Sequence, residues 1–358
     1  MMDPKLQAAL RRERLIKLGA FFMMLVTGLI VLLTVNNLLL SCILAFVTNY
    51  LLAPIVNLLE RRKVPRQLAI IIPFVATGLL IAWGVYSVLP LITSQATLLE
   101  RSLPKYQVDL MQLVANTERR FEGYFKLYDV NFSSEINGWI LTKTTEFTKA
   151  IPAALSGSLT VLLLTPIIAF FMLQDGRSLS RQFLSFVPNN IFEVTLNLQH
   201  QLNEQMGGFI RARFLEAAIV GFVVWLGLQV SGFPYASLLG LFAAVTNLIP
   251  YIGPIIGAVP AVLIALISTD AMITDSMSLN LVIVTSIYFF AQLIDVLFII
   301  PLVVAKIVNL HPVTVIIVII AGAQIMGILG MVISIPVASA IKLIFQAFFR
   351  HLTEFRSN

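Results

Sequence analysis

The chain has 358 residues, of which 58% are hydrophobic and 12% are charged, and its formal net charge is +6. Soluble domains carry about 25% charged residues, so this composition excludes an ordinary soluble protein. Apolar runs of spanning length predict an all-α polytopic membrane protein whose first partner is the lipid bilayer. The excess of Lys and Arg is then expected in cytoplasmic loops and not on a nucleic-acid surface.

Three apolar runs open the chain, at residues 18–35, 38–59 and 68–92. Basic residues precede the first run and fill the loop after the second, Glu60-Arg61-Arg62-Lys63-Val64-Pro65-Arg66. The positive-inside rule places both basic segments, and so the N-terminus, in the cytoplasm. No small-residue cleavage pattern follows the first run, which is therefore expected to be a retained span and not a signal peptide. Residues 1–92 form a predicted three-span unit.

Residues 93–150 are polar, and their Lys and Arg residues are balanced by Asp and Glu. Leucines at near-helical spacing predict one or two amphipathic helices in a small extracytoplasmic insert. A fourth span, residues 151–173, is expected to return to the cytoplasm and to end at Gln174-Asp175-Gly176-Arg177. The rest of the 151–213 unit is partly amphipathic, which fits either a helix in the cytoplasmic interface or a helix packed on the bundle.

Residues 214–349 form the predicted transport unit, with a cytoplasmic tail at 350–358. Its two halves, 214–268 and 281–349, each hold one clean span followed by one interrupted apolar run. The first run breaks at Pro250-Tyr251-Ile252-Gly253 and the second at Gly327-Ile328-Leu329-Gly330. Proline removes a backbone donor and glycine admits turn geometry, so both runs are expected to lose helical structure there.

The two interrupted runs are entered from opposite sides of the membrane, which is the pattern of an inverted-topology repeat. Each half-run has about 15 to 19 residues, near or below the roughly 20 that a crossing helix needs. We therefore expect about six full transmembrane helices plus two inverted re-entrant or short helical hairpins. Short full crossings, a kinked helix and a plain turn are the alternatives. The expected hinge or break residues are Pro250, Gly253, Pro254, Gly257, Pro260, Pro301, Gly327, Gly330 and Pro336.

Asp295 lies inside the span at residues 281–304, close to Gln292. A charge at the bilayer centre costs at least about 2.5–3.5 kcal/mol, so this carboxylate is expected to face the bundle interior or a cavity. It is either a proton- or cation-linked group or a structural partner, for instance of Lys306. Pro301 should loosen the same helix nearby.

Polar side chains also flank the two interruptions: Asn247 and Tyr251 flank the first, and Gln324 precedes the second. Such groups can satisfy the broken backbone or contact a small polar solute. Ser339 and Lys342 match the S-x-x-K pattern of acyl-enzymes, but no partner motif accompanies them, so an enzyme is not expected. No cofactor motif, metal-ligand motif or Walker loop occurs, which argues against ATP-driven transport by this chain alone.

The segment from Asn247 to Pro260, Asn-Leu-Ile-Pro-Tyr-Ile-Gly-Pro-Ile-Ile-Gly-Ala-Val-Pro, resembles the signature of the autoinducer-2 exporter (AI-2E) family of bacterial permeases. The segments from Asp295 to Pro312 and from Gly327 to Pro336 resemble the same family, especially its PerM-like branch. The resemblance implies an inner-membrane transporter that exports a small quorum-sensing signal in some members and is linked to sodium–proton exchange in others. It also implies a homo-oligomer such as a pentamer. Leu297 stands where relatives often carry Asn.

We therefore expect a secondary transporter or exporter of a small polar, autoinducer-2-like solute in the bacterial inner membrane, with both termini cytoplasmic. Coupling to a proton or sodium ion is expected. The predicted binding or coupling residues are Asn247, Tyr251, Gln292, Asp295 and Gln324. The rival predictions are a sodium/proton antiporter, a membrane scaffold, a membrane-embedded enzyme and a channel within an oligomer.

Overall fold

The computed structural model describes residues 37–120, 158–185, 187, 192–267, 277–304 and 310–357, together with short stretches between residues 23 and 35. Across these ranges the regular structure is helical, with no strand. Five of the described helices are long and apolar enough to cross a membrane. The predicted all-α polytopic membrane fold is therefore confirmed. Most of the predicted first span and residues 121–157 lie outside the described residues.

The chain forms two compact units, which are described separately. The first comprises Met1–Ile70 and Ala153–Arg177 and contains α2 (Leu38–Arg61), the start of α3 (Arg66–Arg120) and most of α6 (Ser158–Ser185). Its polar centre is Glu60. The Glu60 Oε1 lies 3.1 Å from Arg66 Nη1, and the Glu60 Oε2 lies 2.6 Å from Arg177 Nη2. These ion pairs tie the basic loop after α2 to α6.

The fourth predicted span does not end at Gln174-Asp175-Gly176-Arg177, because α6 continues to Ser185. A glycine inside a helix costs only about 1 kcal/mol, which is too little to end a helix by itself. Arg66 also donates hydrogen bonds to the backbone oxygens of Leu173 and Gln174, at 2.6 and 3.3 Å. These contacts satisfy backbone acceptors in the turn next to Gly176.

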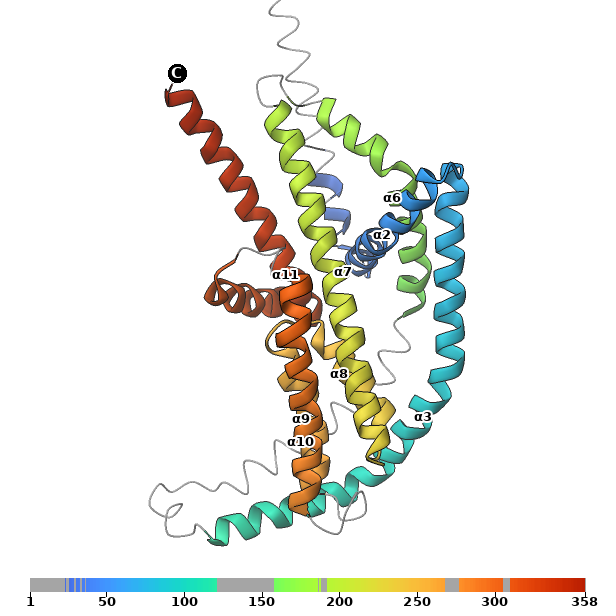
Figure 1. Ribbon diagram of the computed structural model, residues 1–358, viewed down its shortest axis with the longest axis vertical. Helices are drawn as coiled ribbons and strands as arrows, with labels where there is room; N and C mark the ends of the chain where they lie inside the picture. The colour runs from blue at the N-terminus through green and yellow to red at the C-terminus, as the bar shows by residue number, and fades with distance from the viewer. Residues whose placement is uncertain are drawn as a thin grey trace, which may run out of the picture. The chain divides into compact units, whose positions relative to one another are not determined.

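The helix α3 runs for 55 residues, so the predicted boundary at residue 92 falls inside one continuous helix. At 1.5 Å per residue its length is on the order of 80 Å, which far exceeds a hydrocarbon core of about 30 Å. The described part of the polar insert, residues 93–120, is thus an extension of the third span. Three internal prolines, Pro73, Pro90 and Pro104, accompany the curvature that Figure 1 shows for this helix.

The second unit, Ile71–Pro152 with Ser178–Asn358, is built around α7 (Phe192–Val230). The helix α7 has 39 residues. Figure 1 shows it as one unbroken rod. From residue 192 on, the predicted amphipathic segment and the first clean span of the transport unit are therefore a single helix, which packs against α8, α10 and α11. This arrangement favours the prediction of a helix packed on the bundle. The main core lies among α7, α8, α9 and α10, with buried Val224, Leu228, Leu239, Ala261 and Val284.

The first interruption is present between α8 (Ala236–Asn247) and α9 (Gly253–Ile267). Tyr251 has a left-handed backbone with φ of 64°. A Cβ on Gly253 would lie 2.0 Å from the Thr246 backbone oxygen, so only glycine fits this approach. The two helices have 12 and 15 residues. They are about 18 and 22 Å long, shorter than a bilayer core of about 30 Å.

The second interruption lies within α11 (Pro312–Ser357), at Met326 and Gly327. Gly327 has φ of 60° and ψ of −140°, and α11 changes direction in Figure 1. The two parts of α11 meet at Gly322 and Gly330, where a Cβ on Gly330 would lie 1.9 Å from the Gly322 backbone oxygen. The break therefore begins one residue before the predicted Gly327–Gly330 segment, and Gly330 serves as a packing contact.

One hydrophobic cluster joins the flanks of both interruptions. Ile249, from the first interruption, packs in it with Val315 and Ile319 from before the second interruption and Ile335 from after it. Phe209 of α7 completes the buried part of the cluster. The two broken runs, about 80 residues apart in sequence, thus pack together in the same unit.

The helix α10 (Met277–Ile294) passes directly into a wider π-helix, η2 (Asp295–Val304). Pro301 lies within η2, where its missing N–H weakens a regular α-helical ladder. The predicted loosening of this span is therefore a change of helix type that starts at Asp295. π-helical turns are rare and occur frequently at functional sites.

Candidate functional site

A cavity of about 700 Å³ lies among α7, α8, α9, α10 and η2. Most of its walls are apolar, with Val220 and Val224 from α7 and Ile255, Val259 and Val262 from α9. Polar side chains form a second group along the cavity, namely Arg213, Glu216, Asn247, Tyr251, Thr285, Tyr288, Gln292 and Asp295. A volume of this size, with mainly apolar walls and a few polar groups, is typical of small-molecule sites.

Three charged side chains gather at the cavity. Arg213 forms an ion pair with Glu216 through its Nη1 and the Glu216 Oε1, three residues apart on α7. Asp295, at the start of η2, lies within electrostatic reach of both. Glu216 is 2% exposed, Asp295 3% and Arg213 8%. Charges this deeply buried are found almost only where they are paired or serve a function.

Several polar atoms in this group are buried without a hydrogen-bond partner among the described residues. They are Tyr288 OH and both polar atoms of the Asn247 amide, and Glu216 Oε2 and Asp295 Oδ1 have no partner other than the neighbouring carboxyl group. Asn247 is 1% exposed, and the other Asp295 oxygen accepts a bond from Gln292 Nε2 at 3.3 Å. An unsatisfied buried polar group costs about 1–3 kcal/mol. These atoms are therefore the natural contact points for a solute, an ion or water in the cavity.

Four of the five predicted binding residues line this one cavity: Asn247, Tyr251, Gln292 and Asp295. Gln324 does not line it and is exposed on α11, two residues before the second interruption. Among the predicted break residues, Pro250, Pro254 and Gly257 also line the cavity. Gly253 and Gly330 make the close backbone contacts described above. Pro260, Pro301 and Pro336 lie inside helices, and Gly327 forms the second interruption.

Sequence reasoning missed Arg213 and Glu216. Arg213 falls at the end of the partly amphipathic 151–213 unit, and Glu216 falls within the clean span that opens the next unit. The available signal was a carboxylate within a predicted span, three residues after an arginine. That spacing places two side chains on one helix face. Since charges in spans are costly, the pair could have been singled out by the argument that singled out Asp295.

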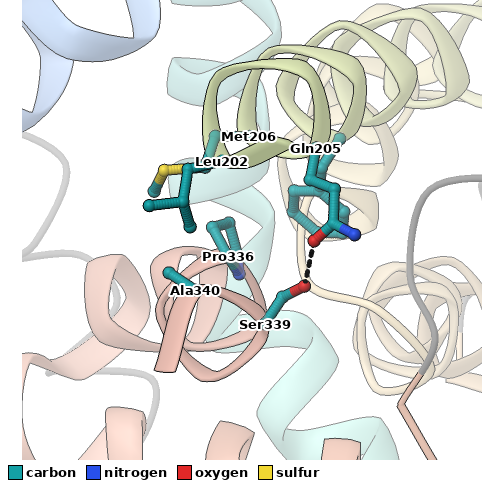
Figure 2. Close-up of a pocket in the computed structure, with 7 residues that line it drawn as sticks. Leu202, Gln205, Met206, Pro336, Ser339 and Ala340 are labelled. Atoms are coloured by element: carbon teal, nitrogen blue, oxygen red, sulfur yellow. Dashed lines mark hydrogen bonds between the residues drawn. The ribbon is translucent and has the colours of Figure 1, made fainter. Parts of the chain in front are cut away.

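A second, very small cavity of about 10 Å³ lies between α7 and α11. Figure 2 shows the Ser339 hydroxyl pointing to Gln205, and it donates a hydrogen bond to Gln205 Oε1 at 2.8 Å. The cavity has room for about one water molecule. Ser339 thus gives its proton to an amide oxygen, which is not a base, and this geometry offers no activated nucleophile.

Ser339→Ala is expected to lower the free energy of unfolding only slightly, by the contribution of one neutral hydrogen bond, about 0.5–1.5 kcal/mol. Transport should be retained within about twofold, since this energy is small and the side chain lies outside the large cavity. Thermal unfolding and solute flux in the same preparation measure both effects. Complete loss of activity with unchanged stability would instead favour an enzymatic role.

The N-terminal end of α8 contacts α3. The Tyr235 hydroxyl lies 3.2 Å from both Ser102 Oγ and Tyr106 OH, and Gln95 Oε1 accepts the Leu238 N–H at 3.0 Å. The start of α8 is therefore anchored by polar contacts. Its C-terminal end, at Asn247, reaches the cavity and the interruption.

Comparison with known proteins agrees with this architecture. The family model for "AI-2E family transporter" matches residues 21–350. The chain is 30% identical to "Putative transport protein YueF" of Bacillus subtilis, over 87% of this chain and 84% of that protein. It is 28% identical to "Putative permease PerM" of Escherichia coli, over 92% of each chain. With apolar helices of spanning length and a match over nearly all of its residues, the chain belongs to the AI-2E family of membrane transporters.

Proposed function

We propose that the protein is a secondary transporter of a small organic solute with a polar group, in the bacterial inner membrane with both termini cytoplasmic. The observation that carries the proposal is the 700 Å³ cavity, whose buried charged cluster lies next to a broken helix. Substrate sites of secondary transporters are typically built at discontinuous helices near the bilayer midplane. The homo-oligomer implied by the family resemblance stays a prediction.

In this proposal the two interrupted segments are re-entrant hairpins that open the cavity to one side of the membrane at a time. The lengths of α8 and α9 support re-entrance, since each is too short to cross a bilayer core of about 30 Å. The shared cluster around Ile249, Val315 and Ile335 couples the hairpins mechanically. A rearrangement at one interruption would then be transmitted to the other through packed side chains.

The charged cluster suits coupling to a cation. One guanidinium faces two carboxyl groups, so the three groups together carry one excess negative charge when all are ionised. A proton or a sodium ion on Asp295 or Glu216 would neutralise that charge. Because a buried net charge is unfavourable, occupancy by a cation or solute would alter the balance between inward-open and outward-open states.

Asp295→Asn is the direct test of coupling. The side-chain volume is kept and one negative charge is lost. In reconstituted vesicles we expect at least about tenfold slower flux and a weaker dependence on the pH or sodium gradient, since one charged contact is worth about 1.5–3 kcal/mol. Glu193→Gln is the control, because Glu193 is an exposed carboxylate at the start of α7. Unchanged flux and unchanged gradient dependence in Asp295→Asn would refute the coupling role.

A sodium/proton antiporter is the second candidate, and the two neighbouring buried carboxyl groups of Glu216 and Asp295 favour it. In that case the cation itself is the substrate. Vesicles that hold purified protein and a pH-sensitive dye distinguish the two functions. Proton movement driven by a sodium gradient without organic solute would support the antiporter, whereas proton movement that requires solute would support solute transport.

A further inference from the structure

We propose that the solute is an amphipathic organic monocation, meaning an amine or quaternary ammonium group on an apolar body of drug-like size. This inference rests on the transport function proposed above and identifies its substrate class. It follows from the charge of the cavity, the size and nature of its walls, and the position of its aromatic side chains.

The charge of the cavity selects against anions. Its charged side chains are Arg213 and Glu216 from α7 and Asp295 from η2, and its other ionisable groups are the phenols of Tyr251 and Tyr288. An anion would have to compete with two carboxylates for a single guanidinium that is already paired. A monocation would instead meet two carboxyl groups, Glu216 and Asp295, whose side chains lie within hydrogen-bond reach of each other. When both carboxyl groups are ionised, the electrostatic complement of the cavity is therefore a single positive charge.

The walls select an organic body and not a bare ion. A sodium ion needs a small cage of oxygen ligands, whereas this cavity has a volume of about 700 Å³. Its apolar lining, including Val220, Val224 and Val262, offers no hydrogen bonds to a polyhydroxylated solute. Such a solute would lose its hydration without replacement along most of its surface. An apolar body gains free energy from the same contact.

Aromatic rings add a second recognition element for a cation. Tyr288 and Phe289 of α10 line the cavity, and Tyr251 lines it from the first interruption. Tyr251 is 59% exposed and Phe289 63%, so neither ring is enclosed by the protein. Aromatic faces attract ammonium groups by about 0.5–2 kcal/mol, depending on how far the cation is desolvated. Asn247, with both amide atoms unpartnered, can accept a hydrogen bond from a protonated amine deeper inside.

The test uses tetraphenylphosphonium and tetraphenylborate, two ions of nearly equal size and opposite charge. Binding of each to purified protein in detergent is measured by equilibrium dialysis, with protein-free micelles as the blank. We expect the wild-type protein to bind the cation at least about tenfold more tightly than the anion, which corresponds to one charged contact. Asp295→Asn should reduce this preference at least about tenfold, and Glu216→Gln should reduce it in the same direction. Glu193→Gln should leave it unchanged.

Equal binding of the two ions by the wild-type protein, or a preference that survives both carboxylate substitutions, would overturn the inference. Because tetraphenylborate binding is expected to be retained or improved in Asp295→Asn, a misfolded variant is recognised by its loss of both ligands. Glu216→Gln then provides the second test. Flux of a neutral or anionic solute that depends on Asp295, without cation preference, would retain the transport function and reject the substrate class. Cation binding without flux of any solute would retain the cation preference of the cavity and reject the transport function.

Discussion

Replacing Arg213 by methionine is expected to destabilise the protein by about 3–5 kcal/mol, because Glu216 and Asp295 would remain buried without their counter-cation. Methionine keeps most of the arginine stem, so lost packing contributes little to the expected effect. Thermal unfolding in detergent, followed by intrinsic fluorescence, measures the loss. Solute flux should also fall to the background of empty vesicles.

The double variant Arg213→Met with Glu216→Gln is the control for this first prediction. Removing both partners of a buried ion pair costs much less than removing one, so part of the stability should return. If the double variant is as unstable as the sum of the two single variants, Arg213 and Glu216 do not act as a pair. A single Arg213 variant of wild-type stability would contradict the buried charge cluster altogether.

Gly330→Ala is the second change with a large expected effect. A Cβ at this position would lie 1.9 Å from the Gly322 backbone oxygen, so the two parts of α11 would have to move apart. Overpacking of this kind costs about 1–3 kcal/mol or more, and here the obstacle is backbone and not a flexible side chain. Because the same parts of α11 pack on Ile249, transport should fall together with thermal stability.

Gly84→Ala is the matched control for Gly330→Ala. Gly84 lies in α3 with no atom within 4 Å of an added Cβ, and alanine is the better helix former. The thermal stability of the Gly84→Ala variant should therefore be unchanged or slightly higher. Equal effects of the two substitutions would mean that the contact between Gly322 and Gly330 does not hold the second interruption in place.

The positions of the interruptions could be predicted from sequence because their causes are local. Pro250 and Gly253 lie three residues apart at the first interruption, and Gly327 takes a positive φ at the second. Asp295 could be singled out for a similar reason, since a carboxylate in a span needs a polar environment. These inferences need no knowledge of which segments pack together.

The partners of Asp295 could not be derived in the same way. Its approach to Arg213 and Glu216 depends on the packing of η2 against α7, which links residues about 80 positions apart. The absence of Gln324 from the cavity likewise depends on how α11 turns at Met326 and Gly327. Hydropathy does not predict the full length of α7, because the first half of this helix is polar and only the second half is an apolar run. The π-helix at Asp295 has no pattern of its own in the sequence.

The central claim is that one cavity, bounded by a broken helix, opens alternately to the two sides of the membrane. Cys42 is the single cysteine of the chain, so Cys42→Ser gives a background for an introduced Ala258→Cys in the cavity wall. A membrane-impermeant thiol reagent should label this cysteine from only one side under one ion gradient and from the other side when the gradient is reversed. Leu80 is exposed on the apolar part of α3, where lipid would keep a water-soluble reagent away. Leu80→Cys should therefore stay unlabelled by the same reagent. Labelling of the cavity cysteine from neither side, or equally from both sides under every gradient, would contradict the account.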